Sequence, residues 1–336
     1  MGAVEHRARA NRSDGRQFAV NRRLRFDFAP STQLQTDARM NSVTEQDIRD
    51  FWNSQPCGTN IVPPTDVHDD DSFLAYLETY DQFRYSREGH ILSMLERFDL
   101  TGKHVLEVGL GQGADSERLI RKGARWTGLD LTAASVEIVG RRLRLKNLPF
   151  ERLEQGSVVK LPFPDASFDF VYSFGVLHHV PDIMSAQAEI RRVLKPGGQV
   201  LVMMYARPSV NFQLSIRLLR RVGLIGAFGL ARLGVKIANP VTARHVELAK
   251  AVGLRSYLQL PNFLNRNTDG PDNAFSRVYD PKSLAADFPS FRVVSTEQDF
   301  NHAPPIPADR LPRSLRKYGW HLWALLEPLP NRPAGR

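Results

Sequence analysis

The segment His104-Val-Leu-Glu-Val-Gly-Leu-Gly-Gln-Gly-Ala114 decides the fold of this chain. Its apolar residues form a run short enough for a buried strand, and glycines follow at alternate positions, Gly109, Gly111 and Gly113. Because glycine has no Cβ, such a turn can take unusual backbone angles and lets a ligand lie against the main chain. A helical stretch then begins, and the free N–H groups of its first turn point into the same space. The segment therefore predicts a strand, a ligand-binding turn and a helix.

A second apolar strand ends in Asp130, 23 residues after Glu107. At about this spacing a carboxylate of the neighbouring parallel strand reaches the hydroxyls of a bound ribose, so the pattern predicts a nucleoside-type cofactor. The glycine spacing alone is compatible with a nicotinamide dinucleotide and with S-adenosylmethionine. Glu107 favours S-adenosylmethionine, because its carboxylate would repel a pyrophosphate and attract the ammonium group of a methionine moiety.

From Gly102 to Tyr205 the chain resembles the class I S-adenosylmethionine-dependent methyltransferases, particularly the ubiquinone/menaquinone-methyltransferase-like group. Each of the matching stretches also occurs in unrelated proteins, and it is their occurrence together in this order that carries the resemblance. They are Val105-Leu-Glu-Val-Gly-Leu-Gly-Gln-Gly113, Gly128-Leu-Asp130, Leu161-Pro-Phe-Pro-Asp-Ala-Ser-Phe-Asp-Phe-Val171, Leu177-His-His179, Arg192-Val-Leu-Lys-Pro-Gly-Gly198 and Val200-Leu-Val-Met203.

The resemblance implies an α/β fold, a doubly wound, mostly parallel seven-stranded sheet of the Rossmann-like methyltransferase type with N-terminal helices and a helical insertion. It also implies S-adenosylmethionine as the cofactor, bound across the carboxyl ends of the first strands. The residues that it assigns to the cofactor are Glu107, Gly109, Gly111 and Gly113 at the methionine end, Asp130 and Leu131 at the ribose, Gly156, Ser157 and Val158 at the adenine, and Phe174 at the border. Many family members carry Asp where Ser157 stands, so a weaker hydroxyl acceptor replaces a carboxylate at the adenine here.

Alternating apolar strands and amphipathic helices predict a parallel sheet covered on both faces. The predicted strands are 104–108, 125–130, 150–155, 168–174 and 199–205, with closing strands at 291–295 and 320–325, and the predicted helices are 114–122, 133–145 and 183–194. Lys195-Pro-Gly-Gly198 is expected to end the last of these helices and to turn the chain into the fifth strand.

Changes in composition divide the chain into five regions. We predict a disordered, Arg-rich tail at 1–40, a helical cap at 41–100, the cofactor-binding core at 101–206, a helical insertion or substrate lid at 207–290, and closing strands of the sheet within 291–330. Ser42-Val-Thr-Glu45 is typical of a capping box and predicts the start of the first cap helix.

The bulk composition is that of a globular enzyme. The chain has 336 residues, 42% hydrophobic and 24% charged, which is enough to bury a sizeable core. A single cysteine, Cys57, excludes an intrachain disulfide and suits a reducing compartment, so a cytoplasmic location is expected. No apolar stretch approaches the ~20 residues needed to cross a bilayer.

The insertion carries most of the chain's net charge of +9. Residues 207–260 hold nine Lys and Arg against one acidic residue, Glu247, and are also rich in apolar residues. Three interpretations remain open: a helical lid with solvated arginines, a site for a lipophilic or anionic substrate or for peripheral contact with a membrane, and a nucleic-acid surface. Nucleic acid is the least favoured, because few aromatic residues lie among the arginines as stacking platforms would require.

For methyl transfer, the protein must align a nucleophile with the methyl group and exclude water. A base is needed only for a hydroxyl or an acidic carbon, and His178 and His179, at the end of the fourth strand, are the candidates. His302 and His321 have no partners at metal-ligand spacing, so no metal site is predicted. The sequence thus predicts a methyltransferase acting on a small, possibly lipophilic, acceptor. The alternatives are an enzyme for RNA or another macromolecule, and a non-catalytic cofactor-binding protein; the oligomeric state stays open.

Overall fold

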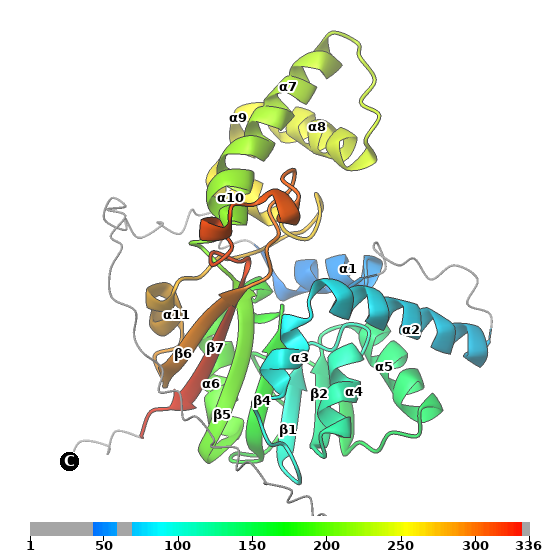
Figure 1. Ribbon diagram of the computed structural model, residues 1–336, viewed down its shortest axis with the longest axis vertical. Coiled ribbons are helices and arrows are strands. Elements are labelled where there is room, and N and C mark those ends of the chain that lie inside the picture. The colour runs from blue at the N-terminus through cyan, green and yellow to red at the C-terminus, as the bar shows by residue number, and fades with distance from the viewer. Residues whose placement is uncertain (1–42, 59–68, 331–336) are drawn as a thin grey trace, which may run out of the picture. The chain divides into compact units, whose positions relative to one another are not determined.

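A computed structural model of the chain describes residues 43–58 and 69–330 (Figure 1). The tail predicted at residues 1–40 lies outside the described residues. No helix among the described residues is long and apolar enough to cross a membrane.

The described residues form a seven-stranded sheet with the strand order β3-β2-β1-β4-β5-β7-β6. The strands are β1 (His104–Val108), β2 (Arg125–Asp130), β3 (Arg152–Gln155), β4 (Phe168–Phe174), β5 (Leu194–Tyr205), β6 (Phe291–Asp299) and β7 (His321–Pro328). The first five run parallel, and β7 is antiparallel to both β5 and β6. The chain order reverses between β1 and β4, where ligands bind in sheets of this type. The predicted fold, a doubly wound and mostly parallel sheet, is confirmed.

Helices cover both faces of the sheet because successive strand residues point to opposite sides. Leu106 and Val108 pack with α6 (Ile183–Val193) and α11 (Pro281–Asp287) on one face. Val105 packs with α3 (His90–Leu95), α4 (Ala114–Arg121) and α5 (Ala133–Leu145) on the other. Each of these strand residues is almost completely buried, so the sheet is the centre of two apolar layers.

The cap contains α1 (Glu45–Ser54) and α2 (Asp70–Arg87). The predicted position of the first capping box was wrong by two residues: the N-cap is Thr44, whose side chain accepts from the Asp47 amide while Asp47 accepts from Thr44. The Asp47 carboxylate therefore takes the part expected of Glu45. This frees the Glu45 side chain for the cavity described below.

Two further elements differ from the sequence expectation. The structure has no separate turn between α6 and β5, because Lys195-Pro-Gly-Gly198 forms an irregularity inside β5, where pairing moves from Phe168–Leu194 to Phe170–Gln199. The insertion begins with a π-helix, η3 (Asn211–Leu219), that continues into α7 (Arg220–Arg232). Single-turn and longer π segments give no hydropathy signal that separates them from an α-helix.

The insertion continues through α8 (Pro240–Val252), α9 (Leu254–Tyr257) and α10 (Leu260–Asn265). We refer to η3, α7 and α8, residues 211–252, as the hairpin; α7 and α8 extend beyond the carboxyl edge of the sheet (Figure 1). Its inner side chains, among them Phe212, Leu224 and Val246, form one apolar cluster with Tyr205 and Trp320 of the sheet edge. The insertion is therefore joined to the sheet through the ends of β5 and β7.

Candidate active site

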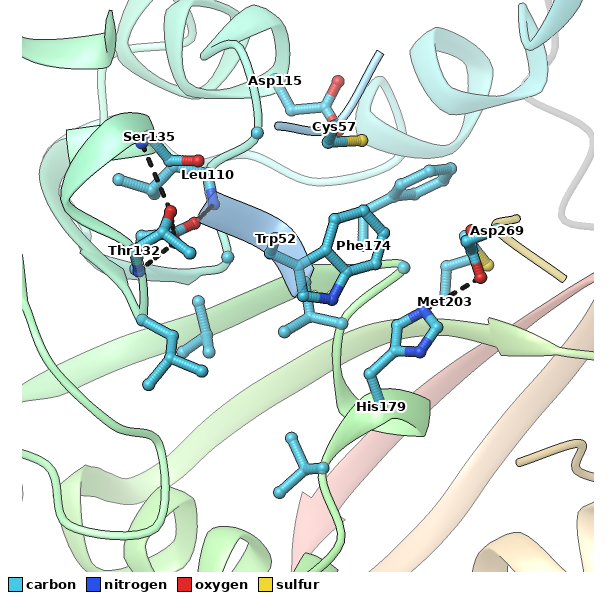
Figure 2. A pocket seen from close by; sticks show the side chains of 18 of the residues that line it. Trp52, Cys57, Leu110, Asp115, Thr132, Ser135, Phe174, His179, Met203 and Asp269 are labelled. Carbon is cyan, nitrogen blue, oxygen red and sulfur yellow. Dashed lines mark hydrogen bonds and ion pairs between the residues drawn. The ribbon is translucent and has the colours of Figure 1, made fainter. Parts of the chain in front are cut away.

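A cavity of about 670 Å³ lies at the carboxyl ends of β1, β2, β4 and β5. One end, the glycine end, contains Leu110 and Thr132, and the other, the His179 end, contains His179 and Asp269; Phe174 and Trp52 lie between them (Figure 2). The predicted site residues that line it are Glu107, Gly109, Gly111, Asp130, Leu131, Gly156, Ser157, Val158, Phe174 and His179. Gly113 and His178 do not line it.

The glycine turn needs residues without a Cβ for two different reasons. At Gly109, φ is +79° and an added Cβ would lie 2.1 Å from a methyl carbon of Val176. At Gly113, φ is +78° and the Cβ would press on Val139 and Arg142 of α5. Gly109 therefore shapes the cavity floor, whereas Gly113 lets α4 begin close to α5.

Glu107 is a buried carboxylate that faces the cavity from the end of β1. Its Oε2 accepts a 2.7 Å hydrogen bond from Trp126 Nε1. Burial, with the nearby Asp115 charge, raises the pKa of Glu107 to about 8. No Lys or Arg in the described part of the chain forms an ion pair with it. A buried carboxylate without a cationic partner, facing a cavity, is suited to a ligand that brings its own positive charge.

Asp130 holds the turn through its carboxylate. Oδ2 accepts from the Leu110 amide at 2.7 Å, and Oδ1 accepts from the amide and the hydroxyl of Thr132 at 2.8 Å each (Figure 2). Burial raises the pKa of this carboxyl, and these donors act against the shift. Asp130 therefore ties the start of the glycine turn to the end of β2, while Oδ2, which accepts from Leu110, keeps further acceptor capacity for a ligand hydroxyl.

The predicted adenine residues meet a side chain from the cap. Ser157 donates its hydroxyl to the Glu45 carboxylate of α1 and accepts from the Val159 amide at 3.2 Å. Glu45 lines the cavity as well. A carboxylate from another element, α1, therefore lies next to Ser157.

A third carboxylate, Asp115 on the first turn of α4, is neutralised within the protein. It accepts from Arg84 Nη2 at 2.7 Å, Tyr85 at 3.0 Å and Tyr172 at 2.9 Å. Arg84 also lies over the Phe174 ring, with its guanidinium carbon 4.7 Å from the ring centroid. This network fixes α2 against α4 and against the end of β4.

The two candidate bases lie in different surroundings. His179 faces the cavity, and its Nδ1 lies 2.7 Å from the Phe275 carbonyl oxygen. Its Nε2 is buried, lies 3.3 Å from Asp269 Oδ2 and has no hydrogen-bond partner among the described residues. Because a carbonyl can only accept, Nδ1 carries a proton and Nε2 is the basic nitrogen in the neutral ring. The other Asp269 oxygen accepts from the Tyr205 hydroxyl at 2.6 Å.

His178 is completely buried beneath the Tyr205 ring, at a centroid distance of 3.8 Å. Neither of its ring nitrogens has a hydrogen-bond partner among the described residues, and burial holds its pKa well below the usual value. The geometry therefore favours His179 over His178 as a base, a choice that the sequence left open.

The wall of the His179 end of the cavity consists mainly of aromatic rings. Its lining includes the rings of Trp52, Phe174, Tyr205, Phe300, His302, Trp320 and His321. Burial lowers the pKa of His302 to about 4 and holds the pKa of His321 well below the usual value, so both rings are neutral near pH 7. An apolar, planar or elongated molecule fits such a wall better than an anion.

Sequence reasoning missed several residues that line this cavity, among them Glu45, Trp52, Tyr205 and Asp269. They come from the cap, from the end of β5 and from the insertion, far from the glycine turn in the sequence. The one available signal was the position of the insertion after the fifth strand, which predicts a lid without naming its side chains. In residues 43–58 and 69–330, no three His, Cys, Asp or Glu side chains come close enough to hold a metal ion.

Residues 106–202 match the protein family described as "Methyltransferase domain". The chain carries a class I S-adenosylmethionine-dependent methyltransferase domain. The glycine turn after β1 and Asp130 at the end of β2 belong to this domain, and β6 and β7 extend its sheet.

Curated relatives share the domain over part of their length. The phthiotriol/phenolphthiotriol dimycocerosates methyltransferase of Mycobacterium tuberculosis is 43% identical over 102 residues, which is 30% of this chain and 37% of the relative. The demethylmenaquinone methyltransferase of Tropheryma whipplei is 38% identical over 108 residues, 32% of this chain and 44% of the relative. The sterol 24-C-methyltransferase ERG6B of Gibberella zeae is 36% identical over 127 residues, 37% of this chain and 33% of the relative. The matches span less than half of the length of each relative.

Among solved structures, an S-adenosylmethionine-dependent methyltransferase from Methanosarcina mazei aligns over 70% of this chain and 97% of its own, with 17% identity and a TM-score of 0.46. The fold of the present chain is assigned from the order of the seven strands in its own sheet.

Proposed function

We propose that the protein transfers the methyl group of S-adenosylmethionine to a small, lipophilic acceptor that binds at the His179 end of the cavity. The observation that carries the proposal is one continuous cavity with two chemically different ends. A buried carboxylate without a cationic partner faces the glycine end, and aromatic rings surround a basic nitrogen at the other.

At the glycine end, Glu107 would face the ammonium group of the methionine moiety, and the backbone of Gly109 to Gly111 would lie along it. Asp130 and Leu131 would contact the ribose. The bound cofactor supplies a methyl group that is already electrophilic, so the residues of this end have to bind and orient rather than activate.

Glu45 and Ser157 would act together at the adenine. The Glu45 carboxylate accepts from the Ser157 hydroxyl through Oε2 and from Arg49 through Oε1, and each oxygen keeps a lone pair for an exocyclic amino group. This pair would replace the aspartate that the resemblance leads one to expect, and it couples cofactor binding to the position of α1.

At the other end, His179 would remove the proton of the acceptor. The Phe275 carbonyl holds the proton on Nδ1, so Nε2 has a lone pair for the proton of a hydroxyl or an acidic carbon. As the acceptor atom forms its bond to the methyl carbon, its proton passes to Nε2, and Asp269 is placed to stabilise the resulting imidazolium.

The aromatic wall supports a lipophilic acceptor, and the relatives are named for a sterol, a demethylmenaquinone and dimycocerosates. Peripheral contact with a membrane through residues 207–260 would bring the protein to such an acceptor, because a lipophilic molecule partitions into a bilayer.

The test is transfer of a labelled methyl group from S-adenosylmethionine into a cell extract. We expect label in small molecules that partition into organic solvent, and no such label with His179→Gln. Label in RNA or protein would instead show that the acceptor is a macromolecule. Cofactor binding without any labelled product would make the chain a non-catalytic binding protein.

A further inference from the structure

The hairpin exposes apolar side chains to an extent found nowhere else in the described residues. Twelve large hydrophobic residues of residues 43–58 and 69–330 are exposed, and eight of them lie between Leu218 and Val252. They are Leu218, Val222, Ile225, Leu230, Leu233, Val235, Val241 and Val252. Leu233 keeps 82% of its surface exposed and lies at the end of α7, where the chain turns towards α8.

These side chains lie opposite the face that packs on the protein. At 100° per residue, Val222, Ile225 and Leu233 fall on one side of α7, and Leu224 and Phe228, which pack in the apolar cluster, fall on the other. Both faces of α7 are therefore apolar, and the structure covers only one of them.

Basic residues lie among the exposed apolar residues in the sequence of the hairpin and directly after it. Arg232, Lys236, Lys250 and Arg255 are exposed and make no ion pair or hydrogen bond with another described side chain. The one acidic residue of the hairpin, Glu247, lies next to Arg244. The hairpin and the helix after it thus combine exposed aliphatic side chains with uncompensated positive charge.

The combination of aliphatic side chains and positive charge indicates which kind of partner this surface binds. A second copy of the same face would bring the same charge and would be repelled. Protein partners use aromatic anchors at the centre of their interfaces, whereas every exposed apolar residue here is Leu, Ile or Val. An anionic bilayer offers headgroups for the cations and an acyl boundary for the aliphatic side chains.

We propose that the hairpin docks on the surface of an anionic phospholipid bilayer, with the segment from Arg232 to Val241 entering the headgroup region. The inner face of the same hairpin packs on Tyr205 and Trp320, which also line the cavity. Docking would therefore place the His179 end next to the membrane, where a lipophilic acceptor concentrates. This last step rests on the proposed function, while docking itself does not.

The test is flotation of the full chain with vesicles of phosphatidylcholine alone or of phosphatidylcholine mixed with phosphatidylglycerol. We expect binding to the mixed vesicles that weakens as salt is raised. Each basic residue near an anionic surface is worth about a five-fold change in partitioning, so Arg232→Glu with Lys236→Glu should lower binding by roughly 25-fold or more. Leu233→Ser with Val235→Ser should lower it roughly tenfold.

The matched controls are Lys282→Glu and Val294→Ser, which change exposed residues of α11 and β6. They should leave vesicle binding unchanged, and all variants should bind S-adenosylmethionine like the unaltered protein. The proposal is overturned if the chain ignores mixed vesicles, binds neutral ones equally well, or loses binding equally in the controls. Dimerisation that the hairpin variants abolish would assign the face to a second copy and would also overturn it. Since vesicle binding needs no acceptor, its failure is separable from a failure of methyl transfer.

Discussion

The ionisation of Glu107 should make the affinity for a cationic ligand depend on pH. Its pKa of about 8 means that the free protein holds a proton on this carboxyl at neutral pH, whereas a cationic ligand prefers the carboxylate. We therefore expect the affinity for S-adenosylmethionine to rise from about pH 6 towards pH 8, by up to about tenfold per pH unit. Calorimetry across this range should show the rise, together with proton release on binding. Glu107→Gln should flatten the profile, and an equally steep profile in that variant would contradict the assignment.

The same ionisation should destabilise the folded protein. A buried carboxyl with a raised pKa favours the protonated form, so stability is lost as pH rises from the ordinary value of 4.5 through 8. Glu107→Gln cannot ionise and should be more stable than the unaltered chain at pH 8, by on the order of 4 kcal/mol. At pH 4 the two should unfold alike, as denaturant titrations at both pH values would show.

His179 and His178 differ in what their nitrogens meet, and this difference gives a matched pair of variants. His179→Gln should lower kcat by about 10²- to 10⁴-fold and leave cofactor affinity unchanged, because it removes only the base. His178→Leu should keep activity, since both His178 nitrogens are buried without a partner in the described residues and an apolar side chain loses nothing there. The measurement is kcat of both variants with an acceptor that the labelling experiment has identified. Equal losses in both variants would refute a base role for His179.

Sequence reasoning reached the residues whose role depends on local pattern. Glu107, the glycines and Asp130 lie within one strand–turn–helix–strand unit, so their spacing predicts that they meet. Asp269 contacts His179 across 90 positions of sequence, through a segment whose helices have no family pattern. The choice between His178 and His179 also needed coordinates, because both follow the same strand and only the backbone turn decides which ring faces the cavity.

Among the elements, the glycine turn gives the sharpest steric prediction. Gly109→Ala would place a Cβ in contact with Val176 at a φ that side chains rarely adopt, so it should lower cofactor affinity more than tenfold and stability by about 1–2 kcal/mol. Gly197→Ala is the control: its φ is +76°, but nothing lies near the added Cβ. It should cost about 1 kcal/mol of stability and leave affinity unchanged. Adding Val176→Ala to Gly109→Ala should restore part of the affinity for the cofactor. If the double variant recovers no affinity, the contact between the added Cβ and Val176 is not the cause of the loss.

Element boundaries followed from the sequence where hydropathy alone sets them. β1, β2, β4 and α5 begin and end at the predicted residues, because each is an apolar run or an amphipathic stripe with a clear break. β5 differs because strand pairing takes up the Pro-Gly-Gly turn as an irregularity, a tertiary effect. The π-helix η3 differs because its hydrogen bonding has no counterpart in the residue pattern.

At the scale of the whole molecule, the cavity depends on parts of the chain that are distant in sequence. The methyltransferase domain supplies the glycine end, the cap supplies Glu45 and Trp52, and the insertion with the closing strands supplies Asp269 and Trp320. The domain match covers residues 106–202 alone, so the His179 end is built mainly by segments beyond it. We infer that these segments set acceptor specificity, while the domain sets the cofactor.

The central claim is that the glycine end binds a positively charged sulfur nucleoside. Its most direct test is a calorimetric titration of the purified chain with S-adenosylmethionine, with NADH as the competing ligand and Asp130→Ala as the variant. We predict binding of S-adenosylmethionine in the micromolar range, loss of that binding in the variant, and no binding of NADH. Tight binding of NADH, or none of S-adenosylmethionine, would contradict the account.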